Sequence, residues 1–264
     1  MSLERFAESA TSARDYPLEA VAEHIEIERR EVSLLGEIRE IIFGAQDGLV
    51  STLAVVAAVA GATSDNVTVL IAGLASAIAG IFSMSVGEYM GSKSQEEIFA
   101  AQVDAEWQEV RHRPFESEAE VAYLFMKEGM DEEDAWTTSA LLAKYPRALL
   151  STMVNKELGL THEDQEETEG SPLRGALFMG GSFAVGGLVP IVPFLFTEGI
   201  GALIMATIAT GAVLFGLGAI KSRWTDRFWL WSGLEILSLA AVAGVAGYFF
   251  GTVLPTILGF ANVV

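Results

Sequence analysis

Long apolar stretches separated by an acidic segment constrain this chain more than any other feature of its sequence. Five stretches are apolar enough and long enough to cross a bilayer: residues 41–61, 67–90, 174–197, 200–220 and 228–250. A spanning helix needs about 20 mostly apolar residues. Because a helix satisfies its backbone hydrogen bonds internally, the pattern predicts an all-α, polytopic membrane protein with five transmembrane helices.

Charge is concentrated outside these stretches. The 264 residues include 35 acids and 16 bases, for a formal net charge of −19, and 19 of the acids lie in residues 91–170. An acidic surface repels phosphate backbones, so nucleic-acid binding is excluded as a whole-chain function. There is no cysteine, which excludes disulfides, thiolate metal sites and a cysteine nucleophile.

The chain therefore divides into four predicted parts: an N-terminal amphipathic segment (1–40), transmembrane helices 1 and 2 (41–90), an acidic helical domain (91–172) and transmembrane helices 3 to 5 (173–264). Within the first part, apolar residues recur at near 3.6 spacing over residues 17–40 and predict an amphipathic helix. Such a helix can lie on the membrane surface or pack on the acidic domain, and the sequence leaves both open.

Basic residues indicate the orientation of the spans. The short connections at residues 62–66 and around Glu198 contain no Lys or Arg. The other flanks of the apolar stretches carry the bases: Arg29, Arg30, Arg39, Lys93, Arg174, Lys221, Arg223 and Arg227. By the positive-inside rule, the N-terminus and the acidic domain are expected in the cytosol and the C-terminus outside.

Turn and cap residues predict the helices of the acidic domain. The first should continue the second span without a break and stop at Pro114. The run Ser117–Glu120 has the pattern of a capping box and is expected to open the next helix, which Gly129 ends. Pro146 and Gly159 should bracket the last helix, and the acidic run Thr161–Glu169 should form a linker into the third span.

Three residues of the first two spans are candidates for a transport pathway. Asp47 lies inside the first span, where an ionisable group is costly unless it faces a polar path or a partner. Met84 and Glu88 are one turn apart on one face of the second span. A thioether and a carboxylate together suit first-row divalent metals such as Fe(II) or Mn(II).

Several acids of the acidic domain are candidate metal ligands. Glu106 and Glu109 share a helical face, and Glu116 and Glu120 are four apart just beyond the turn at Pro114. Folding the second helix back on the first would gather four carboxylates, which repel one another unless cations bind. The alternative is a solvated charged face in a very acidic protein. The four-residue spacing recurs in a further pair, Met153 and Glu157.

Several strings together resemble one family. They are Gly44-x-x-Asp47-Gly48-Leu49 opening a span, Ser83-Met84 near the end of the next, the acidic helical insert, Glu157-Leu158-Gly159-Leu160, and the run from Gly186 to Phe194. In this combination the chain is similar to the vacuolar iron transporter (VIT) family, as a prokaryotic-type member, over about residues 37–250.

The resemblance implies a dimeric exporter that moves Fe(II), and in some members Mn(II), out of the cytosol in exchange for protons. It implies a path past Asp47 and Met84, and metal ligands in the acidic domain at Glu106, Glu109, Glu120, Met153 and Glu157, with Glu116 as the nearest acid for the remaining ligand. The membrane would be the cell membrane of a prokaryote or the vacuolar membrane of a eukaryote.

Two positions depart from the family pattern. Relatives often carry a carboxylate about two turns before the Ser-Met pair, where this chain has Ser76. Glu88, one turn beyond Met84, is the candidate to replace that acid. A second methionine that some relatives carry beside the position of Met153 is replaced by Val154.

The main prediction is a proton-coupled transporter, which is not an enzyme and holds its metal as cargo rather than as a prosthetic group. Two other functions remain as alternatives. One is a metal channel or uniporter without proton coupling. The other is a membrane-anchored, ferritin-like di-iron oxidase, which needs two Glu-x-x-His motifs and two further glutamates. Only the string from Glu109 to His112 fits that motif.

Overall fold

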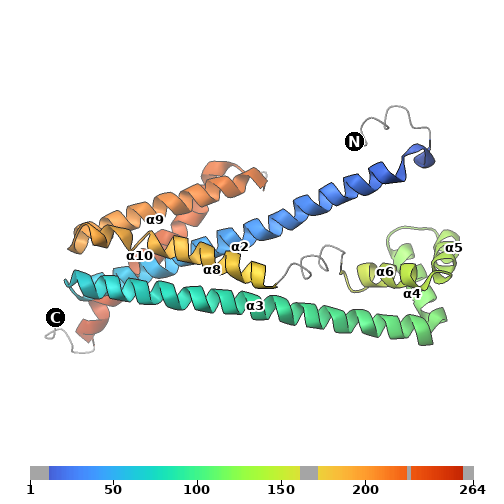
Figure 1. The fold of residues 1–264 in the computed structure, drawn as a ribbon, viewed down its shortest axis with the longest axis horizontal. Coiled ribbons are helices and arrows are strands. Elements are labelled where there is room, and N and C mark those ends of the chain that lie inside the picture. Colours follow the sequence, from blue (N-terminus) through green and yellow to red (C-terminus); the bar gives the residue numbers. More distant parts are fainter. Residues whose placement is uncertain (1–11, 161–171, 225–226, 258–264) are drawn as a thin grey trace. The chain divides into compact units, whose positions relative to one another are not determined.

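The computed structural model describes residues 12–160, 172–224 and 227–257, and within these ranges it is helical with no strand (Figure 1). The all-α prediction is confirmed. The α-helices are α2 (Leu18–Ala62), α3 (Asn66–His112), α4 (Pro114–Lys127), α5 (Glu132–Ala143), α6 (Pro146–Lys156), α8 (Pro172–Leu188), α9 (Gly199–Lys221) and α10 (Trp229–Ile257). Short 3-10 helices are η1 (Ala13–Asp15), η2 (Val192–Leu195) and η3 (Ser222–Trp224).

The chain forms two compact units. The acidic unit comprises residues up to Gly36 together with Met90–Pro172, and the apolar unit comprises Glu37–Tyr89 and the residues from Leu173 onward. The division falls inside α2 and α3, so each of these helices contributes to both units. The expected linker Thr161–Glu169 lies outside the described residues.

Four of the described helices are long and apolar enough to cross a bilayer: α2, α3, α9 and, over Trp229–Val253, α10. The third predicted span, residues 174–197, is not a single helix. Its helix α8 ends at Leu188 after 17 residues, which rise about 25 Å against a hydrocarbon core of roughly 30 Å. A turn that contains Pro190 follows α8, and η2, which contains Pro193, comes next; both prolines lack the N–H that a continuing helix needs.

The N-terminal segment is helical, as the spacing of its apolar residues predicted. Residues 18–40 are helical, but the helix has no break before the first span, because α2 runs continuously from Leu18 to Ala62. The position of residues 18–40, on a membrane surface or packed on the acidic domain, stays a prediction.

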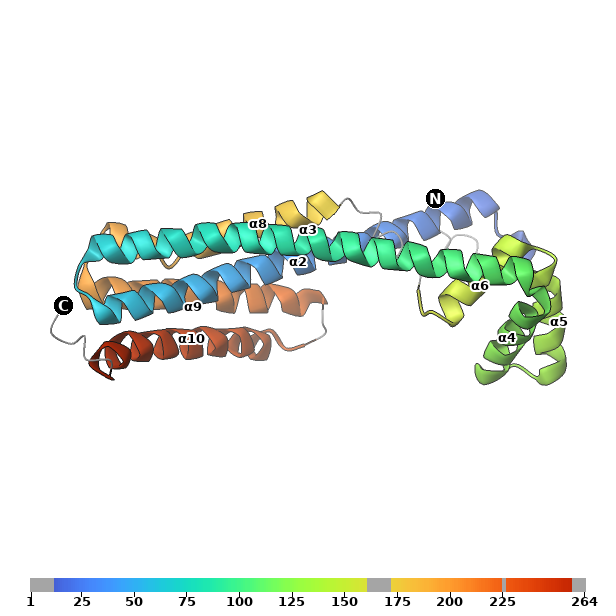
Figure 2. The ribbon, with the colours of Figure 1, turned by 90° about the horizontal axis from the view of Figure 1, so that it is seen from below.

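The core of the apolar unit is built around α2. Its larger cluster joins α2, the start of α3, η2 and α9 through Leu53, Val56, Ala57, Val69, Phe194, Ala202, Leu203 and Ala206. A smaller one joins Leu49 of α2 to Leu214 of α9 and Ile236 of α10. The Asn66 side-chain amide donates a hydrogen bond of 2.6 Å to the Phe194 carbonyl, which ties the start of α3 to η2. Helices α9 and α10 run side by side (Figure 2).

Small residues bring the helices of this unit close together. A Cβ on Gly48 of α2 would lie 2.9 Å from the Gly187 nitrogen of α8 and closer still to the Phe183 carbonyl oxygen. On the other side, Gly247 of α10 lies against the backbone of Ala54. In lipid, where the hydrophobic effect does not drive helix association, such close packing is a main source of it.

In the acidic unit, α4, α5 and α6 gather at the C-terminal end of α3 (Figure 1). The unbroken extension of α3 and the Pro146 start of α6 are confirmed. Gly129 and Gly159 adopt φ values of 102° and 66° just after α4 and α6, a left-handed conformation that favours glycine.

The capping-box prediction was wrong. Helix α4 begins at Pro114 with Arg113 as its N-cap residue, so Ser117 lies inside the helix. The Ser117 hydroxyl donates back to the Arg113 carbonyl over 3.4 Å instead of capping the helix. Proline at the first helical position sets the start, because its fixed φ suits a helix and its missing N–H costs nothing there.

Substituting Gly48 should test the packing of α2 on α8. We expect Gly48→Ala to lower the free energy of unfolding by about 1–3 kcal/mol, because the added methyl meets backbone that cannot move aside cheaply. The measurement is thermal unfolding of the purified protein in detergent. Gly181→Ala is the matched control, since a Cβ on Gly181 meets nothing within 4 Å. Equal melting temperatures for the two variants would contradict this packing.

Candidate metal centre

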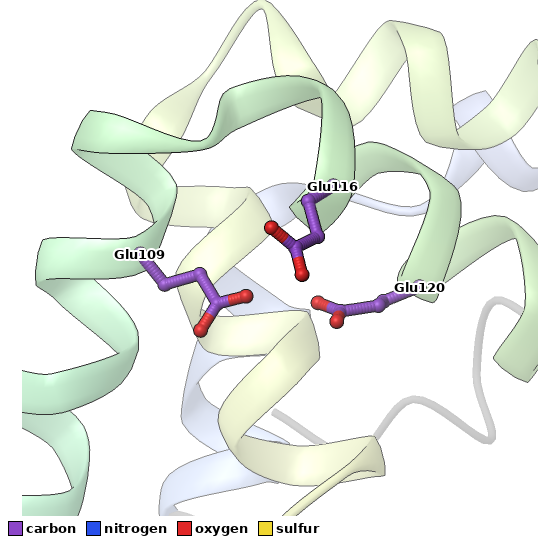
Figure 3. Close-up of side chains that lie close together, drawn as sticks. All are labelled: Glu109, Glu116 and Glu120. Atoms are coloured by element: carbon purple, nitrogen blue, oxygen red, sulfur yellow. The ribbon is translucent and has the colours of Figure 1, made fainter.

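Three glutamates of the acidic unit converge at the junction of α3 and α4 (Figure 3). Glu109 comes from the last turn of α3, and Glu116 and Glu120 lie one turn apart on α4. One carboxylate oxygen from each lies within 4.8 Å of the others. We name these three residues the carboxylate cluster. Oxygen ligands at this separation suit a divalent cation.

The turn between the helices creates the cluster. His112 ends α3 and Pro114 begins α4, so a single residue, Arg113, separates the two helices. Beneath the turn, Val110 of α3 and Val121 of α4 pack in one apolar cluster with Leu149 and Met153 of α6. Because Glu109 and Glu120 are the sequence neighbours of these two valines, the same packing brings the carboxylates together.

The electrostatics of the cluster are those of crowded acids. Burial, followed by the charges of Glu109, Glu157, Glu116 and Glu106, raises the pKa of Glu120 to about 7. Burial, Glu157 and Glu109 likewise raise the pKa of Glu106. The Oε2 atom of Glu120 is buried and has no hydrogen-bond partner within the described part of the chain. A cation would relieve both the repulsion and this unsatisfied oxygen.

One cation from the chain itself already lies at the cluster. The Arg113 guanidinium donates to Glu109 over 3.1 Å and to Glu116 over 3.0 Å. The sequence analysis missed this residue. The sequence does contain a signal for it, because Arg113 is four residues after Glu109 and three before Glu116, which are the spacings of ion pairs along a helix.

The remaining predicted ligands of the acidic unit take different positions. Met153 is fully buried in the apolar cluster under the turn. Glu106 and Glu157 lie outside the group of three, yet the charge of Glu157 raises the pKa of Glu106, and both charges raise the pKa of Glu120. Metal binding by these three residues remains a prediction.

His112 does not join the carboxylate cluster. Its Nδ1 lies 2.8 Å from the Gln108 carbonyl oxygen, and the side chain is exposed. Among the described residues, the cluster therefore holds three carboxylates and no imidazole. A ferritin-like di-iron site, which uses a histidine from each of two Glu-x-x-His motifs, finds no support in this arrangement.

The predicted pathway residues lie in the apolar unit. Asp47 of α2 and Met84 and Glu88 of α3 are all half-buried. Asp47 lies on the same turn as Gly44 and Gly48, and both glycines lie against the backbone of α8. The close approach of α8 to α2 therefore occurs at the turn that carries Asp47.

Asp47 and Met84 lie at a similar depth in the apolar unit, as their positions relative to Phe183 of α8 show. A Cβ on Gly80 of α3 would fall on the Phe183 ring, and one on Gly48 of α2 would meet the Phe183 backbone. Gly48 adjoins Asp47, and Gly80 is one turn before Met84. Both candidate residues thus lie within one turn of the level at which Phe183 packs.

Two acids at the start of this unit, Glu37 and Glu40, were not among the predicted site residues. Glu37 of α2 accepts an ion pair from Arg174 of α8 at 2.7 Å. One turn further along α2, the Glu40 carboxylate lies against Gly175, where a Cβ would be 3.0 Å from Oε1. Glu40 is two turns before Asp47, so a second carboxylate precedes Asp47 along the same helix face.

Comparison with known proteins identifies the family. The model of the VIT family matches residues 38–252. The chain belongs to the VIT family. It is 32% identical to "Vacuolar iron transporter 1" of Eucalyptus grandis over 215 residues, which cover 81% of this chain and 85% of that protein.

Other organisms carry similar proteins. "Vacuolar iron transporter 1" of Arabidopsis thaliana is 32% identical over 81% of this chain and 84% of its own length. "Vacuolar iron transporter" of Plasmodium falciparum is 30% identical over 82% of each chain. Together with the apolar helices, the family match makes this VIT protein an integral membrane protein. The match covers both the carboxylate cluster and the pathway residues.

Metal binding to this VIT protein should release protons near neutral pH. The pKa of Glu120 is raised from about 4.5 to about 7 in the folded protein. In the metal-free protein, protonated Glu120 therefore stabilises the fold most at a pH below its unfolded pKa, and this stabilisation is lost as the pH rises through 7. A bound dication favours the carboxylate. We expect more protons released per Mn²⁺ at pH 6 than at pH 8, measured by calorimetry in buffers of different ionisation enthalpy.

Glu120→Gln should remove the difference in proton release between the two pH values. Glu132→Gln, at an exposed acid of α5, is the control and should keep it. Proton release that is the same at pH 6 and pH 8 in the native protein would show that Glu120 does not titrate with metal binding.

Proposed function

We propose that this VIT protein exports Fe(II), with Mn(II) as a second cargo, from the cytosol across its membrane. The observation that carries this proposal is the carboxylate cluster in a chain whose relatives are named iron transporters. Glu109, Glu116 and Glu120 offer the oxygen ligands that divalent cations bind. In this function the acidic unit collects ions and the apolar unit passes them on.

Asp47 and Met84 are the proposed pathway residues of the apolar unit, with Glu88 one turn beyond Met84. Three points support the assignment: the cost of placing Asp47 in a span, the similar depth of Asp47 and Met84 beside Phe183, and a family match whose range includes both positions. The thioether of Met84 adds a softer ligand, which favours Fe(II) over Mg(II) or Ca(II).

We propose a topology of five crossings, in which α8 and the following turn with η2 together make the third. Residues of η2 pack with α9 in the larger core cluster, so this segment belongs to the apolar unit. The distribution of Lys and Arg then supports a cytosolic N-terminus and acidic unit and an external C-terminus. The functional protein is proposed to be a homodimer in the cell membrane of a prokaryote or the vacuolar membrane of a eukaryote.

A proton gradient is the proposed energy source. A carboxylate in the apolar unit can hold either a metal ion or a proton, so exchange at Asp47 or Glu88 couples the two flows. The sequence contains no Gly-x-x-x-x-Gly-Lys-Ser/Thr phosphate loop that would indicate drive by nucleotide hydrolysis. A channel or uniporter remains the second candidate, because the same pathway residues would serve it.

Substitutions in the pathway should stop metal flux without unfolding the protein. We expect Asp47→Asn and Met84→Ala each to reduce Fe(II) uptake into proteoliposomes by about tenfold or more, the loss of roughly 1.4 kcal/mol of ion stabilisation at the limiting site. Glu235→Gln and Met205→Ala are matched controls at exposed positions of α10 and α9. Near-normal transport by Asp47→Asn would remove Asp47 from the pathway.

Proton coupling should appear as reciprocal flow. With the membrane voltage clamped, a pH difference imposed across the vesicles should drive Fe(II) against its own gradient, and Fe(II) flux should move protons, read with a pH dye inside. Under the proposed exchange, the two flows stop together in Asp47→Asn. Fe(II) flux that neither responds to the pH difference nor moves protons identifies a channel or uniporter.

A further inference from the structure

We propose that Arg113 is the resident counter-cation of the carboxylate cluster, and that its guanidinium leaves the cluster when a divalent metal ion binds. This inference rests on the proposed metal centre and assigns a role to a residue that no ligand pattern includes. Its basis is the pair of contacts that Arg113 makes, 3.1 Å to Oε2 of Glu109 and 3.0 Å to Oε2 of Glu116. Two of the three carboxylates thus already share one positive charge.

The backbone of Arg113 is fixed in the turn. Its N–H donates to the Glu109 carbonyl over 2.7 Å, and its own carbonyl accepts from the N–H groups of Glu116 and Ser117. Pro114 follows directly and restricts the backbone further. The Cα therefore stays beside the cluster whether or not the guanidinium is bound.

The side chain of Arg113, by contrast, is free to move. It is 58% exposed, whereas the Glu109 side chain that it contacts is 20% exposed. A guanidinium at this exposure can exchange its carboxylate partners for water at small cost, since exposed ion pairs contribute little net stability. The Glu109 carboxylate has less access to water as an alternative partner, and a cation reduces its repulsion from Glu116 and Glu120.

The geometry also explains why arginine and metal exclude each other. Arg113 takes one oxygen each from Glu109 and Glu116, and Glu120 faces the same space from the next turn of α4 (Figure 3). A dication bound to all three carboxylates would use the same pair of acids and would repel the guanidinium. Occupation by the chain's own cation therefore lowers the apparent affinity for metal and makes release easier.

The test uses the full-length protein in detergent, with Mn²⁺ as the probe and calorimetry as the measurement. Removing Arg113 with Arg113→Gln should tighten Mn²⁺ binding by about three- to tenfold, since two exposed ion pairs no longer compete. Arg113→Lys should fall between the two, because a point charge cannot bridge both carboxylates as the planar fork does. Arg111→Gln removes the same charge from a residue that instead stacks on Trp107, and should leave the affinity unchanged.

Thermal unfolding provides a second readout that a purely packing role would not produce. Metal-free Arg113→Gln should melt below the native protein at pH 8, and saturating Mn²⁺ should raise its melting temperature by more than it raises that of the native protein. Arg111→Gln should show the native increment.

The possible outcomes separate this inference from the proposed function. Native protein that binds Mn²⁺, with unchanged or weaker binding by Arg113→Gln, overturns the counter-cation role while the metal centre stands. If neither protein binds Mn²⁺, the metal centre is wrong and the role of Arg113 falls with it.

Discussion

Backbone N–H and C=O groups cannot remain unpaired in hydrocarbon, and the architecture of the apolar unit follows from that requirement. Helices meet it, but lipid provides no hydrophobic drive to bring them together, so association depends on close contact. Here α2 provides that contact on two sides, through Gly48 against α8 and through Ala54 against Gly247 of α10. Gly48, which allows the close approach of α8, adjoins Asp47. One packing arrangement therefore both holds the unit together and determines what surrounds this half-buried carboxylate.

The length of the apolar stretches and the residues that begin or end helices predicted most of this fold. Four apolar stretches became helices of spanning length, and Pro146, Gly129 and Gly159 lie at helix ends as expected. The failures have local causes. Hydropathy does not register that Pro190 stops α8, and a capping pattern at Ser117 competed with a stronger signal three residues earlier, where Pro114 begins α4.

The candidate metal centre was predictable in composition but not in detail. Helical spacing paired Glu116 with Glu120, and the turn at Pro114 indicated that Glu109 would meet them; the structure brings these three together. Spacing could not distinguish Met153 as packing from Met153 as a ligand, because a buried thioether under a turn serves either role. Ligand spacing also does not indicate Arg113, because a cationic side chain is not a metal ligand.

Arg113 bears on a property that every transporter needs, which is release of the ion. A closed cage of several charged ligands holds a divalent cation for long times, whereas a transporter must pass its ion on. Three features of the proposed metal centre would avoid such a cage. Its acids are only partly buried, and Glu120, with a pKa raised to about 7, can take a proton when the metal leaves. Arg113, which lies between the two helices and contacts both other carboxylates, can offset one of their two negative charges. Under the proposed exchange, a proton and a guanidinium would together supply the two positive charges that a departing dication removes, so the empty cluster would not be left with three unneutralised carboxylates.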